Sequence, residues 1–287
     1  ARRGIRVGDL FDFKSFKDKV ADALDFHNFV LSKYFRKDPI DSGAIFDSYA
    51  SVAEDLKPMV ADVVPILERL QHSGGNILLE GAQGSLLDID LGTYPYVTSS
   101  NTTASSAGLG SGLGPKDIDY VLGIAKAYTT RVGEGPFPTE LIDSTGEAIA
   151  KKGHEFGATT GRPRRCGWFD AVAMRRAVKV SSVSGICLTK IDVLDDLEVV
   201  KICVDYECDY KRELFDFSSA SLLNATPNYI EIPGWHESTS GLTEYDQLPE
   251  AARNYVKVLE EQIGVPISMI STGPDREETI ILENPFG

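Results

Sequence analysis

The stretch Gly185-Ile186-Cys187-Leu188-Thr189, followed at once by Lys190-Ile191-Asp192, is the part of the sequence that best indicates the fold. Its first five residues are small or apolar and begin at a glycine, which is typical of a short buried strand. Lys190 and Asp192 follow directly, and in parallel sheets ligands bind beyond the carboxyl ends of the strands. The stretch therefore predicts a buried strand with a polar site at its carboxyl end.

Segments on both sides of this stretch repeat the pattern of strand and helix. Helical periodicity predicts a first helix over about 15–35, capped by Ser15, and a second helical region from Ile45 to Gly74. The segment Ile118–Tyr128 could be a helix or a strand. Pro115 and Asp117, which precede it, favour the start of a helix. Further strands are expected over 76–80, 129–132, 198–206, 267–270 and 279–282, and further helices over 143–156, 167–179 and 248–263.

This alternation predicts an α/β fold with a largely parallel central sheet flanked by helices. We expect residues 1–287 to form a single α/β domain region, mainly helical over 1–75 and α/β over 76–287. A Gly- and Ser-rich segment over 93–114 could be a linker, but the bulky Tyr94 and Tyr96 within it argue against that alternative.

The composition excludes several classes of protein. Apolar residues make up 42% of the chain, charged residues 25%, and the formal net charge is −14. Such acidity argues against broad binding to nucleic acid or anionic membranes, although a local basic pocket remains compatible with it. Four scattered cysteines, no zinc spacing and no apolar run of membrane-spanning length predict a reduced, cytoplasmic protein without a transition metal.

Two segments contain residues suited to nucleotide chemistry. An Asp at a strand end, here Asp192, can accept two hydrogen bonds from the edge of guanine, while the stem of Lys190 lies over the base. An ordinary charged strand–loop junction is the alternative. The phosphate-binding pattern G-x-x-x-x-G-K-[ST], which usually accompanies such a base site, does not occur in this sequence.

The second segment is Gly157-Ala158-Thr159-Thr160-Gly161-Arg162-Pro163-Arg164-Arg165. Arginines bind carboxylate or phosphate through two parallel hydrogen bonds, and glycines let the backbone approach a ligand closely. A solvated basic patch is the alternative. Weaker candidates are Gln83, in the loop after the expected strand 76–80, and the hydroxyl-rich segment 94–102, which could equally be an ordinary turn and an ordinary loop.

Six segments together resemble the adenylosuccinate synthetase family, in the family's order and over nearly the whole chain. They are E-G-A-Q-G from Glu80, T-Y-P-Y-V-T-S-S-N-T-T from Thr93, R-V-G-E-G-P-F-P-T-E from Arg131, F-G-A-T-T-G-R from Phe156, L-T-K-I-D from Leu188 and S-T-G-P-D-R from Ser271. The resemblance implies a fragment of a GTP-dependent synthetase fold without its phosphate loop, covering the C-terminal two-thirds of the family's length.

The family joins IMP to L-aspartate, with GTP as co-substrate and Mg²⁺ as cofactor, through 6-phosphoryl-IMP in AMP biosynthesis. Carried over to this sequence, the resemblance implies IMP contacts at Arg2, Gln83, Thr98, Val132 and Arg162. It implies aspartate contacts at Ala158, Thr159, Thr160, Gly161, Arg162, Pro163 and Arg164, and GTP contacts at Arg164, Lys190, Ile191, Asp192, Ser271, Thr272 and Gly273. Arg2 resembles an arginine that reaches the IMP site of the neighbouring subunit, which implies a homodimer.

The resemblance also implies what this sequence lacks. The family's Gly-rich phosphate loop, its catalytic Asp, which also binds Mg²⁺, and its catalytic His have no counterpart here. We therefore expect no catalytic or metal-binding residue in this chain and no turnover by the chain alone. One alternative is a non-catalytic module that binds IMP or GTP. A dehydrogenase-like protein using the glycines between Gly108 and Gly114 is disfavoured, because G-x-G-x-x-G followed by a helix is absent.

Overall fold

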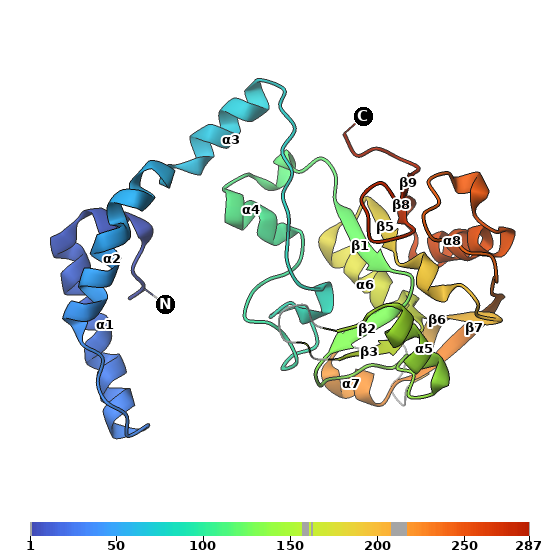
Figure 1. Cartoon of the computed structure of the whole chain (residues 1–287), viewed down its shortest axis with the longest axis horizontal. Coiled ribbons are helices and arrows are strands. Elements are labelled where there is room, and N and C mark those ends of the chain that lie inside the picture. Colours follow the sequence, from blue (N-terminus) through green and yellow to red (C-terminus); the bar gives the residue numbers. More distant parts are fainter. Residues whose placement is uncertain (1, 157–160, 162, 208–216, 287) are drawn as a thin grey trace. The chain divides into compact units, whose positions relative to one another are not determined.

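The computed structural model describes residues 2–156, 161, 163–207 and 217–286. The chain forms two compact units, Ala1–Arg69 and Leu70–Gly287, which are described separately (Figure 1). Among the described residues, no helix has both the length and the apolar character needed to cross a membrane.

The smaller unit is helical. Its main helices, α1 (Phe13–Lys33) and α2 (Ser42–Leu56), pack against each other around a small apolar core. The core consists of Leu10, Phe16, Val20, Leu24 and Ala53. The turns η1 (Val7–Phe11) and η2 (Lys57–Met59) flank these helices, and α3 (Val63–His72) follows. Pro58 accounts for the interruption at Lys57–Met59, because proline cannot donate a helical hydrogen bond.

The predicted N-cap of the first helix is wrong by three residues. Asp12 is the N-cap of α1, and its carboxylate accepts a hydrogen bond from the backbone N–H of Ser15 at 3.1 Å. Ser15 is thus the residue that is capped. An aspartate at this position also places a negative charge at the positive end of the helix dipole, which a serine cannot do.

The strand expected over residues 76–80 is also absent. These residues follow α3 as irregular chain, and the side chain of Leu78 is 79% exposed. An apolar run becomes a strand only when a neighbouring strand pairs with its backbone groups. No described strand pairs with this run, so its apolar composition alone misleads the prediction.

Four strands form the central sheet of the larger unit, in the order β1-β5-β8-β9. The strands β1 (Leu122–Lys126), β5 (Gly185–Thr189) and β8 (Ile267–Ser271) are parallel, and β9 (Thr279–Ile281) is antiparallel to β8. The prediction of a largely parallel sheet is confirmed, as are the strands expected near residues 185, 267 and 279. Figure 1 shows the three parallel strands side by side.

The ambiguous segment 118–128 contains strand β1, so the helix start suggested by Pro115 and Asp117 is wrong. These two residues belong to a single 3-10 turn, η4 (Pro115–Asp117), and the chain then extends. Every residue of β1 pairs with β5, from Leu122 opposite Gly185 to Lys126 opposite Thr189. Pairing along the whole strand thus outweighs the local helix signal.

Two smaller sheets and several helices surround the central sheet. The strands β2 (Thr129–Val132) and β3 (Arg164–Gly167) form an antiparallel pair, and β4 (Phe169–Asp170), β6 (Val199–Glu207) and β7 (Thr226–Pro233) form a second sheet. The helices of this unit are α4 (Ser105–Ser111), α5 (Ser144–Lys152), α6 (Ala171–Ser181), α7 (Ser219–Leu223) and α8 (Glu250–Ile263). Short 3-10 turns lie at η3 (Ser85–Leu87), η5 (Ile191–Leu194) and η7 (Tyr245–Gln247).

Two predicted helices are shorter than expected. The helix of 143–156 ends as α5 at Lys152, and the helix of 167–179 begins as α6 only at Ala171. Asp170 explains the later start, since its carboxylate caps α6 by accepting a hydrogen bond from Ala173 N–H at 3.0 Å. Of the residues predicted as helix, Gly167 instead ends β3, which pairs with β2, and Phe169 and Asp170 form β4, which pairs with β6.

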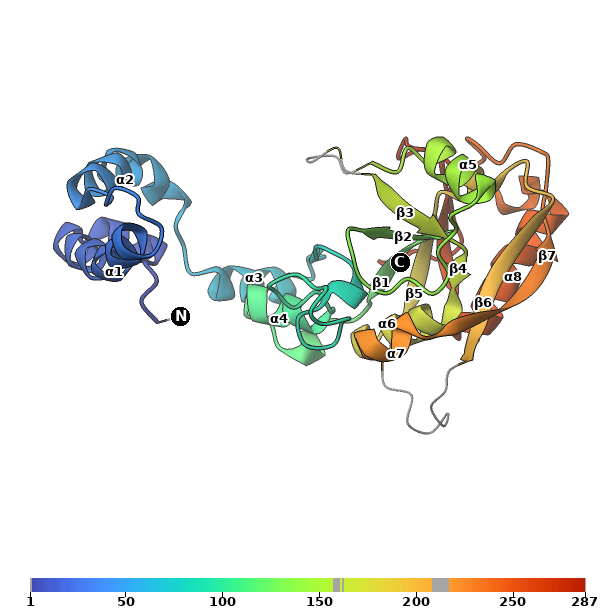
Figure 2. The same ribbon diagram turned by 90° about the horizontal axis from the view of Figure 1, so that it is seen from below.

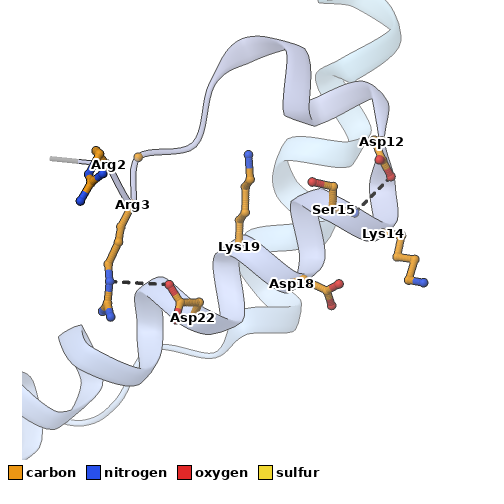
Figure 3. A pocket seen from close by; sticks show the side chains of 9 residues that line it. Arg2, Arg3, Asp12, Lys14, Ser15, Asp18, Lys19 and Asp22 are labelled. Atoms are coloured by element: carbon orange, nitrogen blue, oxygen red, sulfur yellow. Dashed lines mark hydrogen bonds and ion pairs between the residues drawn. The ribbon is translucent and has the colours of Figure 1, made fainter.

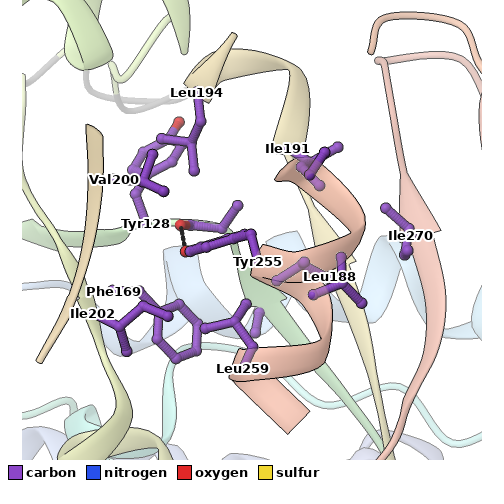
Figure 4. Close-up of a cluster of buried hydrophobic side chains, with 14 of the residues drawn as sticks. Tyr128, Phe169, Leu188, Ile191, Leu194, Val200, Ile202, Tyr255, Leu259 and Ile270 are labelled. Carbon is purple, nitrogen blue, oxygen red and sulfur yellow. Dashed lines mark hydrogen bonds between the residues drawn. The ribbon is translucent and has the colours of Figure 1, made fainter. Parts of the chain in front are cut away.

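The main core lies between the central sheet, helix α8 and the β4-β6-β7 sheet. Figure 4 shows Tyr255 and Leu259 of α8 among side chains of the strands, and Figure 2 shows α8 beside the long pair β6 and β7. The Tyr255 hydroxyl donates to the carbonyl of Ala127 at 2.6 Å, so the buried phenol is paired. The core thereby fixes the chain just beyond the carboxyl end of β1.

We predict that Leu188→Ala destabilises the chain by about 3 kcal/mol, the usual cost of removing a fully buried leucine side chain. Leu188 is 0% exposed in the central strand β5. The measurement is urea denaturation followed by circular dichroism. Ile142→Ala is the matched control, because Ile142 is 92% exposed and its truncation should change the free energy of unfolding by less than about 0.5 kcal/mol. Equal losses in the two variants would contradict the core described here.

Candidate functional site

The carboxyl ends of the three parallel strands meet at one edge of the central sheet. Lys126 at the end of β1 lies opposite Thr189 of β5, and Leu188 lies opposite Ile270 of β8. The segments 190–192 and 271–273, which leave β5 and β8, therefore emerge next to each other. Both segments were predicted to contact the same nucleotide, and the sheet brings them to the edge where ligands of such folds bind.

A single buried carboxylate organises this edge. The side chain of Glu155 is 0% exposed and accepts hydrogen bonds from three cations. Lys126 Nζ lies 2.8 Å from both carboxylate oxygens, Arg164 Nη1 lies 2.8 Å from Oε2, and Lys190 Nζ lies 3.1 Å from Oε1. The hydroxyl of Tyr128 donates to Oε1 at 2.5 Å. We call these five residues the Glu155 cluster.

The charges in the Glu155 cluster do not balance. Three cations surround one carboxylate, and the side chains of Lys126, Arg164 and Lys190 are 24%, 29% and 35% exposed. Burial opposes ionisation of Glu155, but the hydrogen bonds from Lys126, Tyr128 and Arg164 outweigh it and lower its pKa from 4.5 to about 2. The excess of positive charge suits an anionic ligand such as a phosphate or a carboxylate.

Helix α5 and its C-terminal turn place Glu155. Backbone hydrogen bonds run from Gly153 to Ile149 and from Glu155 to Ala150, at 2.8 and 2.9 Å, and close the helix. A Cβ atom at position 153 would overlap the hydroxyl of Tyr128, so only glycine lets the turn approach the cluster this closely. The carbonyl of Gly153 also accepts a hydrogen bond from Lys190 Nζ.

Glu155 also closes the neck of the arginine-rich loop. Its backbone carbonyl accepts a hydrogen bond from Arg164 N–H at 2.9 Å, and Phe156 and Pro163 form a β-bridge across the same neck. Of the predicted aspartate-binding residues, the described ones are Gly161, Pro163 and Arg164. The predicted Ala158, Thr159, Thr160 and Arg162 lie outside the described residues.

The predicted guanine segment begins with a strained residue. Lys190 has a φ of 63°, in the left-handed region that side chains other than glycine seldom adopt. Its contacts with Glu155 and Gly153 hold it there. Ile191 is fully buried, and Asp192 is half-buried, with burial raising the pKa of its carboxyl. The turn thus anchors an apolar side chain and leaves the acidic one partly accessible.

The neighbouring segment 271–273 is held by its own hydrogen bonds. The buried Thr272 hydroxyl donates to the carbonyls of Leu242 and Glu278 at 2.8 and 3.1 Å, and the Ser271 hydroxyl donates to the carbonyl of Gly273 at 3.0 Å. These bonds fix the backbone of the turn. In this structure Ser271 and Thr272 use their hydroxyls to shape the turn.

A cavity of about 420 Å³ lies beside the Glu155 cluster. Val132 and Arg164, both predicted ligand contacts, line it, whereas the predicted Gln83 and Thr98 do not. Gln83 is exposed with a φ of 64°, and its neighbour Gly84 lines the cavity. Much of the remaining lining is apolar and includes Leu86, Leu87, Ile124, Met174, Ala177 and Ile186. The structure thus places only part of the predicted IMP set around this cavity.

Asp88 and Arg131 fix the loop that contains Thr98. The buried carboxylate of Asp88 accepts hydrogen bonds from the backbone N–H groups of Asp90, Leu91 and Thr102, at 2.6 to 3.0 Å. Burial opposes ionisation of the Asp88 carboxyl, but these hydrogen bonds outweigh burial and lower the pKa from 3.8 to about 2. Arg131 binds the other side of the loop, donating to the Thr93 hydroxyl at 3.0 Å. Sequence analysis assigned neither residue a role.

Arg2 lies in the smaller unit. It lines a surface cavity of about 540 Å³ with several acidic and basic side chains, shown in Figure 3. The lining residues are Arg2, Arg3, Gly4, Asp12, Lys14, Ser15, Asp18, Lys19 and Asp22. Arg3 forms an exposed ion pair with Asp22 at 3.9 Å. Charges of both signs alternate here, so this cavity by itself shows no marked preference for an anion.

No motif in the sequence pointed directly to Glu155, Lys126 or Tyr128. Glu155 directly precedes the F-G-A-T-T-G-R segment, and an acidic residue beside an arginine-rich loop was the available clue. Lys126 and Tyr128 lie in the segment whose secondary structure was ambiguous, so their place at the sheet edge was hidden. Within the described residues, no group of three or more His, Cys, Asp or Glu could hold a metal ion. A basic edge of this kind does not fit a site in which protein carboxylates hold Mg²⁺.

The fold and the site define an α/β protein that presents cations at the carboxyl edge of a parallel sheet, a place suited to an anionic ligand. The family model for adenylosuccinate synthetase matches residues 1–280. Adenylosuccinate synthetases of Alkalilimnicola ehrlichii and Pseudomonas putida are 55% and 58% identical over 287 residues. The alignments cover all of this chain and 66% and 67% of those relatives, so the chain spans about two thirds of their length.

A solved structure is similar as well. The structure of the fully ligated adenylosuccinate synthetase from Plasmodium falciparum superposes with a TM-score of 0.90 at 35% identity, covering 98% of this chain and 66% of that one. The chain therefore belongs to the adenylosuccinate synthetase family, as the sequence motifs indicated.

We predict that the chain loses stability as the pH falls from about 5 towards 2. The pKa of Glu155 is lower in the folded chain, so unfolded chains take up its proton first, and acid favours unfolding. The lowering from 4.5 to about 2 corresponds to about 3 kcal/mol. Urea denaturation at several pH values measures the effect. The gap in stability between the wild-type chain and Glu155→Gln should narrow as the pH falls, and a constant gap would contradict the role of the ionised carboxylate.

Proposed function

We propose that the chain is the substrate-binding portion of an adenylosuccinate synthase, a ligase that forms a C–N bond. The reaction joins IMP and L-aspartate to adenylosuccinate in AMP biosynthesis, while GTP is converted to GDP and phosphate. The observation on which this rests is that the family's predicted nucleotide segments, 190–192 and 271–273, leave adjacent parallel strands at a cation-rich edge. We also propose that the chain corresponds to the C-terminal two thirds of its relatives.

Guanine recognition is proposed for Lys190, Ile191, Asp192, Ser271, Thr272 and Gly273. Asp192 is partly accessible, and an ionised carboxylate there can accept hydrogen bonds from N1–H and the 2-amino group of guanine. Adenine offers no such pair of donors, so Asp192 would select guanine. The rigid turn around Thr272 supports this role, because a fixed backbone can close over a base at low entropic cost.

Aspartate recognition is proposed for the loop Ala158–Arg164, with Arg164 also contacting GTP. The substrate aspartate has two carboxylates, which arginines bind through paired hydrogen bonds. Arg164 supports this proposal, because it lines the cavity of about 420 Å³ and its guanidinium is held by Glu155. The proposed IMP contacts are Arg2, Gln83, Thr98, Val132 and Arg162.

The chemistry proposed is phosphorylation of the 6-oxygen of IMP by GTP, followed by displacement of phosphate by the amine of aspartate. Phosphorylation turns a poor leaving group into a good one, and positioning with charge neutralisation supplies most of the catalysis. The cations of the Glu155 cluster suit the neutralising part. We propose that the acid–base groups and the ligands of Mg²⁺ lie in the part of the relatives that this chain does not span.

Three further proposals follow from the family. The protein is a homodimer in which Arg2 contacts the IMP site of the neighbouring subunit. It acts in the cytoplasm on small molecules, and it binds neither nucleic acid nor membranes. The net charge of −14 supports the last point, since it opposes attraction to polyanions.

We predict that the chain binds GDP at least tenfold more tightly than inosine diphosphate, which lacks the 2-amino group. Asp192→Asn should bring this ratio close to one, because the ionised acceptor is lost. Isothermal calorimetry with both nucleotides measures the ratio. The matched control is Asp196→Asn, which changes a carboxylate that is 75% exposed and paired with Lys152, and should leave the ratio unchanged. An unchanged ratio in Asp192→Asn would contradict the proposed guanine site.

We predict that the folded chain, supplied with IMP, GTP, L-aspartate and Mg²⁺, releases no phosphate above a protein-free blank. The reason is that the proposed catalytic groups lie outside this chain. A phosphate-release assay measures this, with circular dichroism as the check of folding. Turnover above the blank would overturn that assignment and place the catalytic base within residues 1–287. A folded chain that binds neither GDP nor IMP would contradict the proposed function as a whole.

A further inference from the structure

We propose that Glu155 is a positioning residue that sets Arg164 and Lys190 in the geometry that an anionic nucleotide requires. This inference rests on the proposed function, because it assumes that the sheet edge binds such a ligand. It assigns a role to a residue that contacts no ligand itself.

Burial identifies Glu155 as the centre of the cluster. Its side chain is 0% exposed, whereas the cations that bind it remain 24–35% exposed. A buried charge is tolerated only when hydrogen bonds and opposite charges compensate it. Glu155 has four such donors within 3.1 Å, so its position is fixed by its surroundings. Glu155 therefore lies at the buried centre of the cluster, and the three cations lie between it and the surface.

Connectivity shows that Glu155 joins segments that are separate in the sequence. Lys126 ends β1, Lys190 follows β5, and Arg164 begins β3 at the neck of the arginine-rich loop. The carboxylate bonds to all three, and the backbone carbonyl of Glu155 also accepts from Arg164 N–H at 2.9 Å. A displacement of Glu155 would thus move both the neck of the loop and the turn that begins at Lys190.

The cations that Glu155 binds are accessible to a ligand, which distinguishes a positioning role of Glu155 from a purely structural one. Arg164 lines the cavity of about 420 Å³, and Lys190 lies two residues before the half-buried Asp192 in the same turn. The cations therefore face solvent or the cavity on one side and Glu155 on the other. Without the carboxylate, three cations within one cluster would repel each other and move apart. Loss of the carboxylate is therefore expected to change the geometry of the ligand-binding cations as well as the stability of the chain.

The experiment compares GDP and IMP affinities of the chain by isothermal calorimetry for the wild type, Glu155→Gln and Glu155→Asp. Glu155→Gln should weaken GDP binding at least tenfold, with a smaller change, below about threefold, for IMP. Glu155→Asp keeps the charge on a shorter stem and should give a GDP affinity between the other two. This partial rescue by charge is a result that a purely structural role would not produce.

The matched control is Glu140→Gln. Glu140 is a partly buried acid that pairs with an arginine, Arg165, and neither of these two residues hydrogen-bonds to Glu155. Its loss should leave GDP affinity within about threefold of the wild type. Circular dichroism and thermal melting establish which variants are folded, and if Glu155→Gln does not fold, Glu155→Asp decides the question.

The possible outcomes distinguish failure of the Glu155 inference from failure of the proposed function on which it rests. If the wild-type chain binds GDP and folded Glu155→Gln binds it equally well, the inference is overturned while the proposed function stands. The same holds if only Glu155→Asp folds and it binds GDP as well as the wild type does. If both affinities fall by the same factor in the Glu155 variants, Glu155 is structural and the inference is again overturned. If the folded wild-type chain binds no GDP, the proposed function itself fails.

Discussion

The arrangement of the candidate site depends on one constraint: the carboxylate of Glu155 is fully buried and must be compensated. Compensation comes from Lys126, Arg164 and Lys190, which belong to segments far apart in the sequence. Each cation is bound on its inner side and accessible on its outer side. The same ion pairs that satisfy the buried acid therefore hold a set of positive groups at the edge of the sheet, where the parallel strands end. A chain with a net charge of −14 thus acquires a local basic site through an acidic residue placed behind it.

Other buried carboxylates in the larger unit fix loops in a similar way. Asp88 accepts backbone hydrogen bonds from the loop that holds Thr98, and Asp195 accepts from Trp235 Nε1 at 2.6 Å and from the Thr239 hydroxyl at 2.8 Å. In each case a short acidic side chain satisfies donors that have no partner in a helix or sheet. Internal polar contacts therefore help to order the irregular connections around the sheet. This explains how long stretches without regular structure can hold defined positions near the site.

Much of the fold follows from the sequence, because buried strands and amphipathic helices produce regular apolar patterns. Gly185–Thr189 and Ile267–Ser271 are short apolar runs bounded by turn residues, and both are strands of the predicted parallel sheet. The failures occur where pairing decides the outcome. Residues 76–80 have the composition of a buried strand but no described partner, and β1 has a helix-like start but pairs fully with β5. Composition records how apolar a segment is, whereas pairing depends on which other segment lies beside it.

The sequence could predict the residues proposed as ligand contacts, but it could not predict the residues that position them. Lys190, Asp192 and Arg164 were predicted as ligand contacts because their segments match motifs of the family. Glu155, Lys126 and Tyr128 were missed because their roles arise only when separate segments meet, and no spacing in the sequence records that meeting. A sequence motif identifies the residues whose types suit direct contact with a ligand. The residues behind these contacts are selected by the need to compensate a buried charge, so a structure is required to find them. Glu155 connects the two groups, because its buried carboxylate binds the cations that are proposed to contact the ligand.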